Sequence, residues 1–391
     1  MGDINKSSDT DFVSVHQTRE NPPVVTATAS DKSEAQKQDT AQSILGSGIL
    51  NDQQFDYTLS VLIPLIQIVN IFALLGNILN VAVFVRLGFS ETVNISLIAL
   101  ALSDLLSVAL CIWAVLCYWP YFWDSSGLPF NAINISVLTV AALRAYTTRT
   151  VACITAFISI ERCLCIAAPS KVKRIITSSF TLTAMIVIAL ITIGPYFLVT
   201  YISYKFAWVF YPHLNATILD VIPVTSRSAV LMEKIVMTFC GVVQPVAAFV
   251  IVVLCTIFII VQLQKAASWR KSVTSAGRQR GDNSRTRPAP PKAAVKSSNS
   301  SKEEDLARMV VAIATNFIVC FTPTCALLFG TAALEELSLF GIYRRMFVVL
   351  MMISFLAEST SASLNILIYY NMATKYRSTL RQLLRLDAPD N

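Results

Sequence analysis

Long apolar runs separated by short polar segments dominate the pattern of this chain. A helix that crosses the hydrocarbon core of a bilayer needs roughly 20 mostly apolar residues, and within lipid it satisfies its own backbone hydrogen bonds. Seven stretches are long enough: Thr58–Val85, Val93–Cys117, Ile135–Ile160, Ser178–Tyr204, Val236–Gln262, Met309–Leu334 and Met346–Tyr370. The pattern therefore predicts an all-α membrane protein, built as a seven-transmembrane helix bundle.

Composition and charge agree with that fold and orient it. The 391 residues are 54% hydrophobic and 14% charged, which lies outside the usual balance of a soluble domain. Eleven of the basic residues lie between Lys265 and Arg308, and connections rich in Lys and Arg stay in the cytoplasm. An odd number of spans then places the N-terminus outside a plasma-membrane protein. The net charge of +7 suits an anionic lipid surface, and no nucleic-acid-binding module is present.

The chain divides into five regions. We expect an extracellular disordered tail (1–56), spans one to five (57–263), a disordered cytoplasmic third loop (264–305), spans six and seven (306–371), and a short cytoplasmic amphipathic helix with a tail (372–391). Three asparagines in N-x-S/T sequons fall on the outer side and are candidate glycosylation sites: Asn5, Asn134 and Asn215.

Polar residues within the spans are costly in lipid, so each is a candidate functional residue, with helix–helix contact as the competing explanation. Together with one aromatic and proline motif, the polar marks along the chain include Asn77, Asp104, Glu161-Arg162, Phe317-x-x-Cys320-Phe321-x-Pro323 and Asn365-x-x-x-Tyr369. In this order and on these spans they resemble the marks of the rhodopsin-like G-protein-coupled receptors, over residues 57–385. More narrowly, the segments after Glu161, around Trp269 and after Tyr370 are similar to gastropod mollusc receptors described as chemosensory.

This resemblance implies a switch at the inner end of the bundle. Arg162 would be held by Glu161 and Glu303 in the inactive receptor and would face a heterotrimeric G protein once released. The alternative for Glu303 and Arg162 is a pair of solvated charges at the interface. Asn365 and Tyr369 belong to the same switch, and Phe317, Phe321 and Pro323 form the toggle of helix six.

The resemblance also implies partners. An extracellular ligand, a peptide or a small chemosensory molecule, would move helix six relative to helix three. Arrestin and receptor kinases are possible further partners, since serines and threonines lie beside basic residues in the third loop.

Several positions depart from the family pattern. Phe321 stands where the family has a tryptophan in span six, and Ile366 where it has a proline in span seven. The family's cysteine at the outer end of span three falls on Val137, and the outer loop from Lys205 to Lys234 contains no cysteine. Both halves of the usual outer disulfide are therefore absent.

Asp104 has no basic partner nearby in the sequence. A lone carboxylate at this depth is protonated, hydrated or bound to a cation. With Asn77, Ser361 and Asn365 it forms either a sodium–water site or a simple interhelical polar network, and both remain open. We expect no other cofactor and no further metal site.

Arg144 and Glu358 are the unusual charges of the outer half. Arg144 precedes Arg162 by 18 residues, which at about 100° per residue gives the same helix face, about 27 Å further out. Glu358 lies seven residues before Asn365 and shares its inward stripe. A ligand acid could bind Arg144, a ligand base could bind Glu358, the two could neutralise each other, or Arg144 could extend to the interface. Arg149 lies on a different face of this helix from Arg144, and we assign it no role.

Other classes of protein find less support. Span seven contains no lysine for a retinal Schiff base, which excludes an opsin. The two histidines, His16 and His213, lie in outer segments without an H-E-x-x-H motif, so we expect no enzyme. A multi-pass small-solute transporter is the alternative function, although the paired half-repeats of such proteins are not found.

Overall fold

The computed structural model of this protein describes residues 50–117, 128–168, 172, 174–212, 215–280, 291–334, 336–338 and 341–384, without the side chains of 132–133, 269–280 and 291–303. Seven helices in these residues are long and apolar enough to cross a membrane. The predicted fold class, a seven-helix transmembrane bundle, is thereby confirmed.

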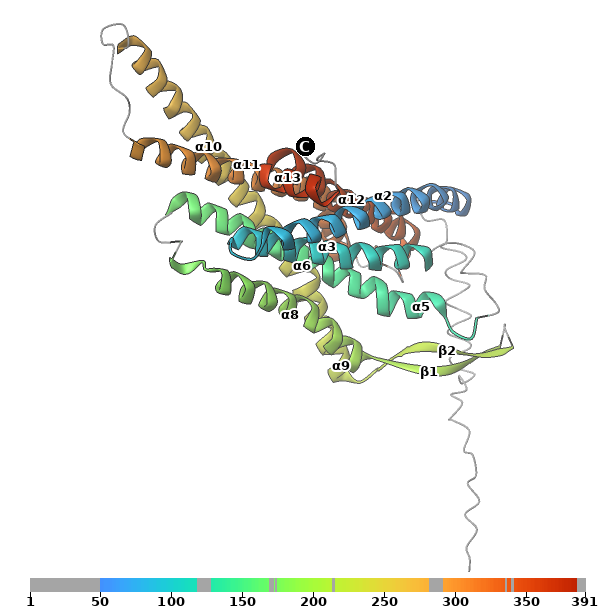
Figure 1. Cartoon of the computed structure of the whole chain (residues 1–391). Helices are drawn as coiled ribbons and strands as arrows, with labels where there is room; N and C mark the ends of the chain where they lie inside the picture. Colours follow the sequence, from blue (N-terminus) through green and yellow to red (C-terminus); the bar gives the residue numbers. More distant parts are fainter. Residues whose placement is uncertain are drawn as a thin grey trace, which may run out of the picture.

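Figure 1 shows how the helices run side by side. They are α2 (Asp52–Leu87), α3 (Thr92–Cys117), α6 (Ala142–Ala167), α8 (Ser178–Ser203), α10 (Gln244–Arg280), α11 (Pro291–Ala333) and α12 (Arg344–Met372). Two of them have short helical extensions in front: α5 (Ala132–Ser136) with the π-helical segment η1 (Val137–Ala141) leads into α6, and α9 (Arg227–Thr238) with the π-helical segment η2 (Phe239–Val243) leads into α10. These extensions lengthen the third and fifth spans.

The first helix begins at Asp52 instead of Thr58 because the chain supplies a cap there. The Asn51 side chain accepts a hydrogen bond from the backbone N–H of Gln54, and the Gln54 side chain accepts one from the backbone N–H of Asn51. Such a capping box satisfies N–H groups that have no partner within the helix. Polar capping residues therefore extend the helix beyond its apolar run.

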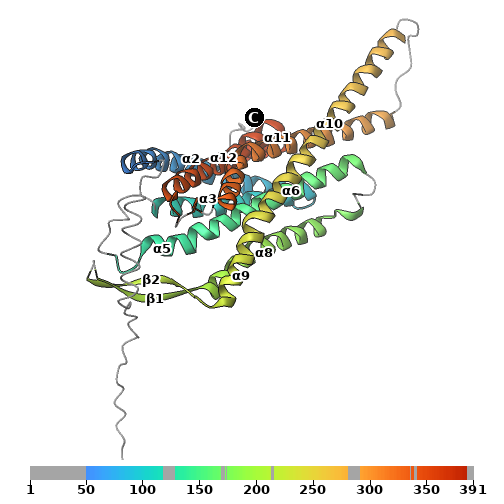
Figure 2. The ribbon, with the colours of Figure 1, turned by 180° about the vertical axis from the view of Figure 1, so that it is seen from behind.

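The long helices α10 and α11 extend past the other helices at one end of the bundle, as Figure 2 shows from behind. They continue to Arg280 and begin at Pro291, so much of the loop predicted as disordered (264–305) is helical. Residues 281–290 lie outside the described part. Lys, Arg, Ala and Gln are good helix formers, and this explains how a polar segment without an apolar stripe continues the helix.

Each helix packs against specific neighbours. Helix α2 lies between α3 and α12, α12 also contacts α11, and α6 contacts α3, α8 and α10. Near the start of α12 the buried side chains are aliphatic and aromatic, with Phe55, Ile66 and Met352 among them. At the opposite end Phe84 and Tyr369 meet edge to face, with ring centroids 5.0 Å apart. The apolar contacts thus continue along the bundle.

A β-hairpin that the sequence did not predict follows α8. Strand β1 (Tyr204–Tyr211) pairs antiparallel with β2 (Ala216–Pro223), and the hairpin lies along one end of the bundle (Figure 1). We call this end the hairpin end. At the opposite end, α13 (Thr374–Leu383) follows α12 directly and packs against α2.

The hairpin is fastened to the start of α5 by a hydrogen-bond cluster centred on Asp220, which is 4% exposed. Its carboxylate accepts hydrogen bonds from Asn131 at 3.2 Å, from Asn134 at 3.0 Å and from the hydroxyl of Tyr211. Burial, followed by the hydrogen bond to Asp220, raises the pKa of Tyr211 to about 12. The backbone adds a bond from Asn131 N–H to the Leu219 carbonyl at 2.8 Å.

No disulfide strengthens this attachment. Each of the nine cysteines of the chain has a free thiol. Val137, which stands where the resembling receptors have a cysteine, lies in η1. The Asp220 cluster holds the hairpin beside the start of helix three, where the receptors that the sequence resembles carry their disulfide. The chain thus fastens this hairpin with a buried carboxylate in place of a covalent bond.

Candidate functional site

The end of the bundle opposite the hairpin carries a buried arginine paired with a buried acid. Arg162 Nη2 lies 2.7 Å from Glu161 Oε1, and the hydroxyl of Thr92 on α3 donates to that same oxygen at 2.6 Å. Both charged side chains are almost fully buried. This contact links α6 to α3 and keeps the guanidinium engaged within its own helix.

Glu303, the second acid expected near Arg162, belongs to α11, but its side chain is outside the part of the chain that the structure describes. Its neighbour Glu304 pairs with Arg308 along the same helix, with 2.7 Å between Arg308 Nη2 and Glu304 Oε1. The proposed contact between Glu303 and Arg162 thus stays a prediction.

Polar contacts cross the middle of the bundle, where Asn316, which sequence reasoning missed, links two of the predicted residues, Ser361 and Asn365. Asn365 donates to Asp104 Oδ2 at 2.9 Å. Asn316, on α11, donates to the carbonyl of Ser361 at 3.0 Å and lies 3.3 Å from Asn365 Oδ1. Asn77 joins through a bond of 3.2 Å to the Ala362 carbonyl. Asn316 belongs to none of the motifs recognised in the sequence. As a polar residue within an apolar span, it could nevertheless have been singled out.

Sodium binding can be tested against the residues that surround Asp104. A cavity of about 40 Å³ lies between Asp104 and Glu358, and a water needs roughly 10–15 Å³, so a few waters fill it. Val151 lines this cavity with methyl groups, while Ser107 is hydrogen-bonded to Thr148 at 3.1 Å. Glu358 is already paired with Arg144 and Asp104 accepts a hydrogen bond from Asn365, so these residues fit an interhelical polar network better than a cation site.

A second, smaller network ties α13 to the bundle. The hydroxyl of Tyr376 donates to Asn80 Oδ1 at 2.6 Å, and Asn80 donates to Asn77 Oδ1 at 3.2 Å. Asn80 is fully buried, and burial also raises the pKa of Tyr376 above its usual value. The polar contacts thus continue from α2 to the short helix that follows α12.

Removal of the Tyr376 hydroxyl tests this tie. We expect Tyr376→Phe to lower the free energy of unfolding by about 1–3 kcal/mol, because the buried Asn80 oxygen loses its donor. Thermal unfolding of the purified protein in nanodiscs measures the change. Tyr370→Phe is the matched control, since the Tyr370 hydroxyl accepts a long, exposed hydrogen bond of 3.4 Å from Arg381. Equal unfolding temperatures for the two variants would contradict the prediction.

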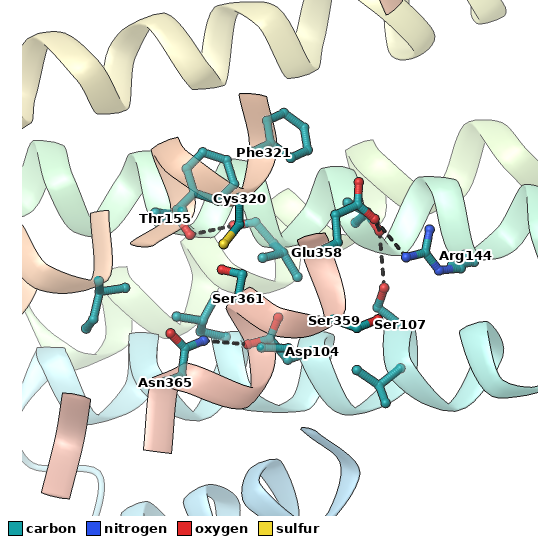
Figure 3. Close-up of a pocket in the computed structure, with 17 residues that line it drawn as sticks. Asp104, Ser107, Arg144, Thr155, Cys320, Phe321, Glu358, Ser359, Ser361 and Asn365 are labelled. Atoms are coloured by element: carbon teal, nitrogen blue, oxygen red, sulfur yellow. Dashed lines mark hydrogen bonds and ion pairs between the residues drawn. The ribbon is translucent and has the colours of Figure 1, made fainter. Parts of the chain in front are cut away.

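Arg144 and Glu358 meet in the half of the bundle nearer the hairpin. Arg144 Nη2 lies 2.8 Å from Glu358 Oε2, and the guanidinium also stacks 3.7 Å from the centre of the Phe355 ring. Figure 3 shows this pair on one side of the small cavity and Asp104 with Asn365 on the other. Arg144 and Glu358 thus pair with each other and Arg144 is buried within the bundle, while ligand contact by either residue stays a prediction.

Glu358 contacts more than one helix. Its Oε1 accepts a hydrogen bond from Thr324 on α11 at 2.6 Å, and its Oε2 also receives one from Thr148 on α6 at 3.4 Å. One carboxylate of α12 thus holds both α6 and α11. A change in the charge or position of Glu358 would therefore alter the contacts of both α6 and α11.

Aromatic rings pack next to this carboxylate. Phe317 and Phe321 on α11 stack with centroids 4.9 Å apart, and Phe321 lies 6.3 Å from the ring of Phe249 on α10. Pro323 lies within the same helix, two residues after Phe321. Both phenylalanines also line the small cavity (Figure 3). Phe317 and Phe321 thus share this cavity with the Arg144–Glu358 pair, and their role as a toggle stays a prediction.

A larger cavity of about 910 Å³ opens at the hairpin end. Tyrosines and aliphatic side chains form much of its wall, and charged residues stand at the starts of α2 and α12; the lining includes Asp52, Asp56, Leu138, Tyr146, Tyr196, Tyr204, Arg344, Arg345 and Val348. Drug-sized ligands occupy cavities of about 300–1,000 Å³ with mainly apolar and aromatic walls. Size and lining both suit a small organic molecule.

The candidate glycosylation sites have different surroundings. Asn134 is exposed, but its amide nitrogen donates to Asp220, and a glycan would be attached to that same nitrogen. Asn215 stands in the turn of the hairpin with a φ of 46° and is exposed. Asn5 lies outside the described residues. Glycosylation of all three remains a prediction.

Comparison with known proteins identifies a family for most of the chain. Residues 64–387 match the family model described as serpentine type 7TM GPCR chemoreceptor Srw, which covers more than half of the 391 residues. No curated protein matches the chain significantly.

Proposed function

Because this chain belongs to the serpentine seven-helix chemoreceptors of the Srw family, we propose that it binds an extracellular chemical ligand and activates a heterotrimeric G protein. The hairpin end then faces outward and the Arg162 end faces the cytoplasm of a plasma-membrane receptor. The basic residues of α10, α11 and α13 support this orientation. The rhodopsin-like order of the polar motifs supports G-protein coupling.

The observation that carries the proposal is a pair of polar contacts that join α11 to α12. Beside the small cavity, Thr324 of α11 binds Glu358, and further along Asn316 of the same helix binds Ser361 and Asn365. A ligand that displaces Glu358 removes a contact that holds α11 against α12. Packed helices switch between discrete arrangements, so the far end of α11 moves away from Arg162.

Release of Arg162 is the signalling step in this proposal. In the described arrangement Glu161 holds the guanidinium at 2.7 Å, which leaves it unavailable to a partner. Movement of α11 opens the inner end, and Arg162 then contacts the G protein. Arrestin and receptor kinases would recognise the same open end and the third loop. Peptides and small chemosensory molecules are both candidate ligands, and the cavity of about 910 Å³ favours the small molecule.

Basal nucleotide exchange tests the proposal without a ligand. Purified protein in nanodiscs is mixed with G proteins of each major class, and GTP uptake is measured. We expect Glu161→Gln to raise basal exchange several-fold, because it weakens the charge that holds Arg162, and Arg162→Ala to abolish it.

Arg308→Ala is the matched control, since this exposed arginine pairs with Glu304 of its own helix. It should behave as the unmodified chain. If Glu161→Gln gave no more exchange than empty nanodiscs with every class of G protein, the receptor proposal would be wrong. Concentrative uptake of solutes by vesicles containing the protein would then favour a transporter.

A further inference from the structure

Arg149 is a cation within the bundle that no acid neutralises in the described part of the chain. The other two arginines of α6 have partners there: Arg144 pairs with Glu358 and Arg162 with Glu161. Asp104 can take up a proton and become neutral, but an arginine keeps its charge in a protein. Uncompensated charge at this depth is costly and marks functional sites in membrane helices.

The guanidinium of Arg149 is fixed between α6 and the π-helical start of α10. It lies over the ring of Tyr146, with 4.4 Å from its central carbon to the ring centre. Its Nη2 would be 3.7 Å from a Cβ at Gly241 in η2, so the glycine leaves room beside the charge. Segments of π-helix within longer helices often occur at functional sites.

Two hydrogen-bond donors are left without partners at this place. Arg149 Nη1 and the Tyr146 hydroxyl are both buried, and apart from each other they have no hydrogen-bond partner within the described structure. A buried donor of this kind has lost its hydrogen bonds to water without gaining a protein partner, and this lowers the stability of the fold. Two adjacent unpaired donors, one of them charged, form the recognition pattern for an anion.

The larger cavity reaches Tyr146, which forms part of its wall together with Tyr196 and Leu138. At the starts of α2 and α12 the cavity is lined by two acids and two arginines, Asp52, Asp56, Arg344 and Arg345, so the formal charges balance there. The unbalanced charge is that of Arg149, which lies over the Tyr146 ring and is not itself part of the cavity wall. Arg149 also lies 13 residues from Arg162, about 20 Å along the helix, which places it well inside the membrane.

We propose that Tyr146 and Arg149 bind the anionic group of the ligand, and that the ligand is a small organic acid with one carboxylate on an apolar or aromatic body. The carboxylate accepts hydrogen bonds from the Tyr146 hydroxyl and from Arg149 Nη1, while the body occupies the larger cavity. This inference rests on the proposed receptor function and names the chemistry of its ligand. Arg144, whose charge Glu358 already neutralises, is not the anion site.

The first test uses the ligand-free protein in nanodiscs of phosphatidylcholine, which contain no anionic lipid. We expect Arg149→Gln to unfold at a higher temperature than the unmodified chain, because the substitution removes an unpaired charge. Arg144→Gln should unfold at a lower temperature, because it leaves Glu358 unpaired. A lower unfolding temperature for Arg149→Gln would mean that Arg149 is a structural residue, and would overturn the proposal.

The second test adds benzoate, phenylacetate or octanoate, each compared with its uncharged amide. At least one acid should raise the unfolding temperature of the unmodified protein more than its amide does. Binding of that acid should weaken roughly 10- to 100-fold in Arg149→Gln. Arg149→Lys should retain part of the binding, and Tyr146→Phe should weaken it less than Arg149→Gln.

Arg227→Gln is the matched control, because it removes an exposed arginine of α9 that does not line the cavity. It should bind the acid as the unmodified chain does. No response to any of the acids, or the same response with Arg149→Gln, would overturn the proposal. Because this readout needs no G protein, it can fail while basal nucleotide exchange succeeds, and the two proposals are tested separately.

Discussion

Replacement of Glu358 by leucine is expected to lower the free energy of unfolding by about 3–5 kcal/mol, because it leaves the Arg144 guanidinium buried without its acid. Arg144 is 3% exposed, and the ring of Phe355 covers one face of the guanidinium. The same substitution removes the acceptor of Thr324, so α11 also loses a contact with α12. Chemical or thermal unfolding of the purified protein in nanodiscs measures the loss.

The double variant Arg144→Leu with Glu358→Leu separates the charge from the packing. Apolar residues of similar volume often replace a buried ion pair with little or no loss of stability, so the double variant should be more stable than Glu358→Leu alone. A double variant as unstable as the sum of the two single ones would show that the charges do not act as a pair. In that case the distance of 2.8 Å would not report their coupling.

Replacement of Asp220 by alanine is expected to free the hairpin while the bundle remains folded. The carboxylate accepts three side-chain hydrogen bonds and one from the backbone N–H of Val221 at 2.7 Å. Hydrogen bonds to charged groups contribute about 1.5–3 kcal/mol each, so the loss of this cluster weakens the attachment on the order of 3 kcal/mol. Amide hydrogen exchange in the hairpin should then become roughly 100-fold faster.

Hydrogen exchange followed by mass spectrometry resolves this local effect from global unfolding. Peptides that include Leu219 and Asn131 should lose protection, since their backbone bond of 2.8 Å depends on the docked hairpin. Asp56→Ala, at an exposed acid of the same end, serves as the control and should leave the hairpin protected. Unchanged exchange in Asp220→Ala would show that the backbone contacts alone fasten the hairpin.

Helical periodicity and the order of the motifs predicted many of the residues of the candidate site. The 18-residue spacing between Arg144 and Arg162 and the position of Glu358 before Asn365 were enough to predict that Arg144 and Glu358 could meet. This worked because an α-helix turns by a constant angle per residue, so that residues far apart along it can be assigned to one face. The sequence could not show whether Arg144 and Glu358 pair with each other, because this depends on the distance between two helices.

The residues that sequence reasoning missed depend on contacts between elements. Asn316 forms hydrogen bonds with Ser361 and Asn365 on another helix. Asp220 accepts hydrogen bonds from two asparagines on a different segment. Neither partner set has a fixed separation along the chain. The unexpected hairpin has the same cause, because its alternating apolar residues sit between two membrane spans and did not stand out from them.

The sequence by itself determined the seven spans, the fold class and the order of polar residues along them. Lipid offers the backbone no hydrogen bonds, so an apolar run of sufficient length has one stable form, the helix. Tertiary structure alone decided which charges are neutralised. It places Glu358 against Arg144 and leaves Arg149 with unpaired hydrogen-bond donors, because helix rotation and register set which side chains come within hydrogen-bond distance.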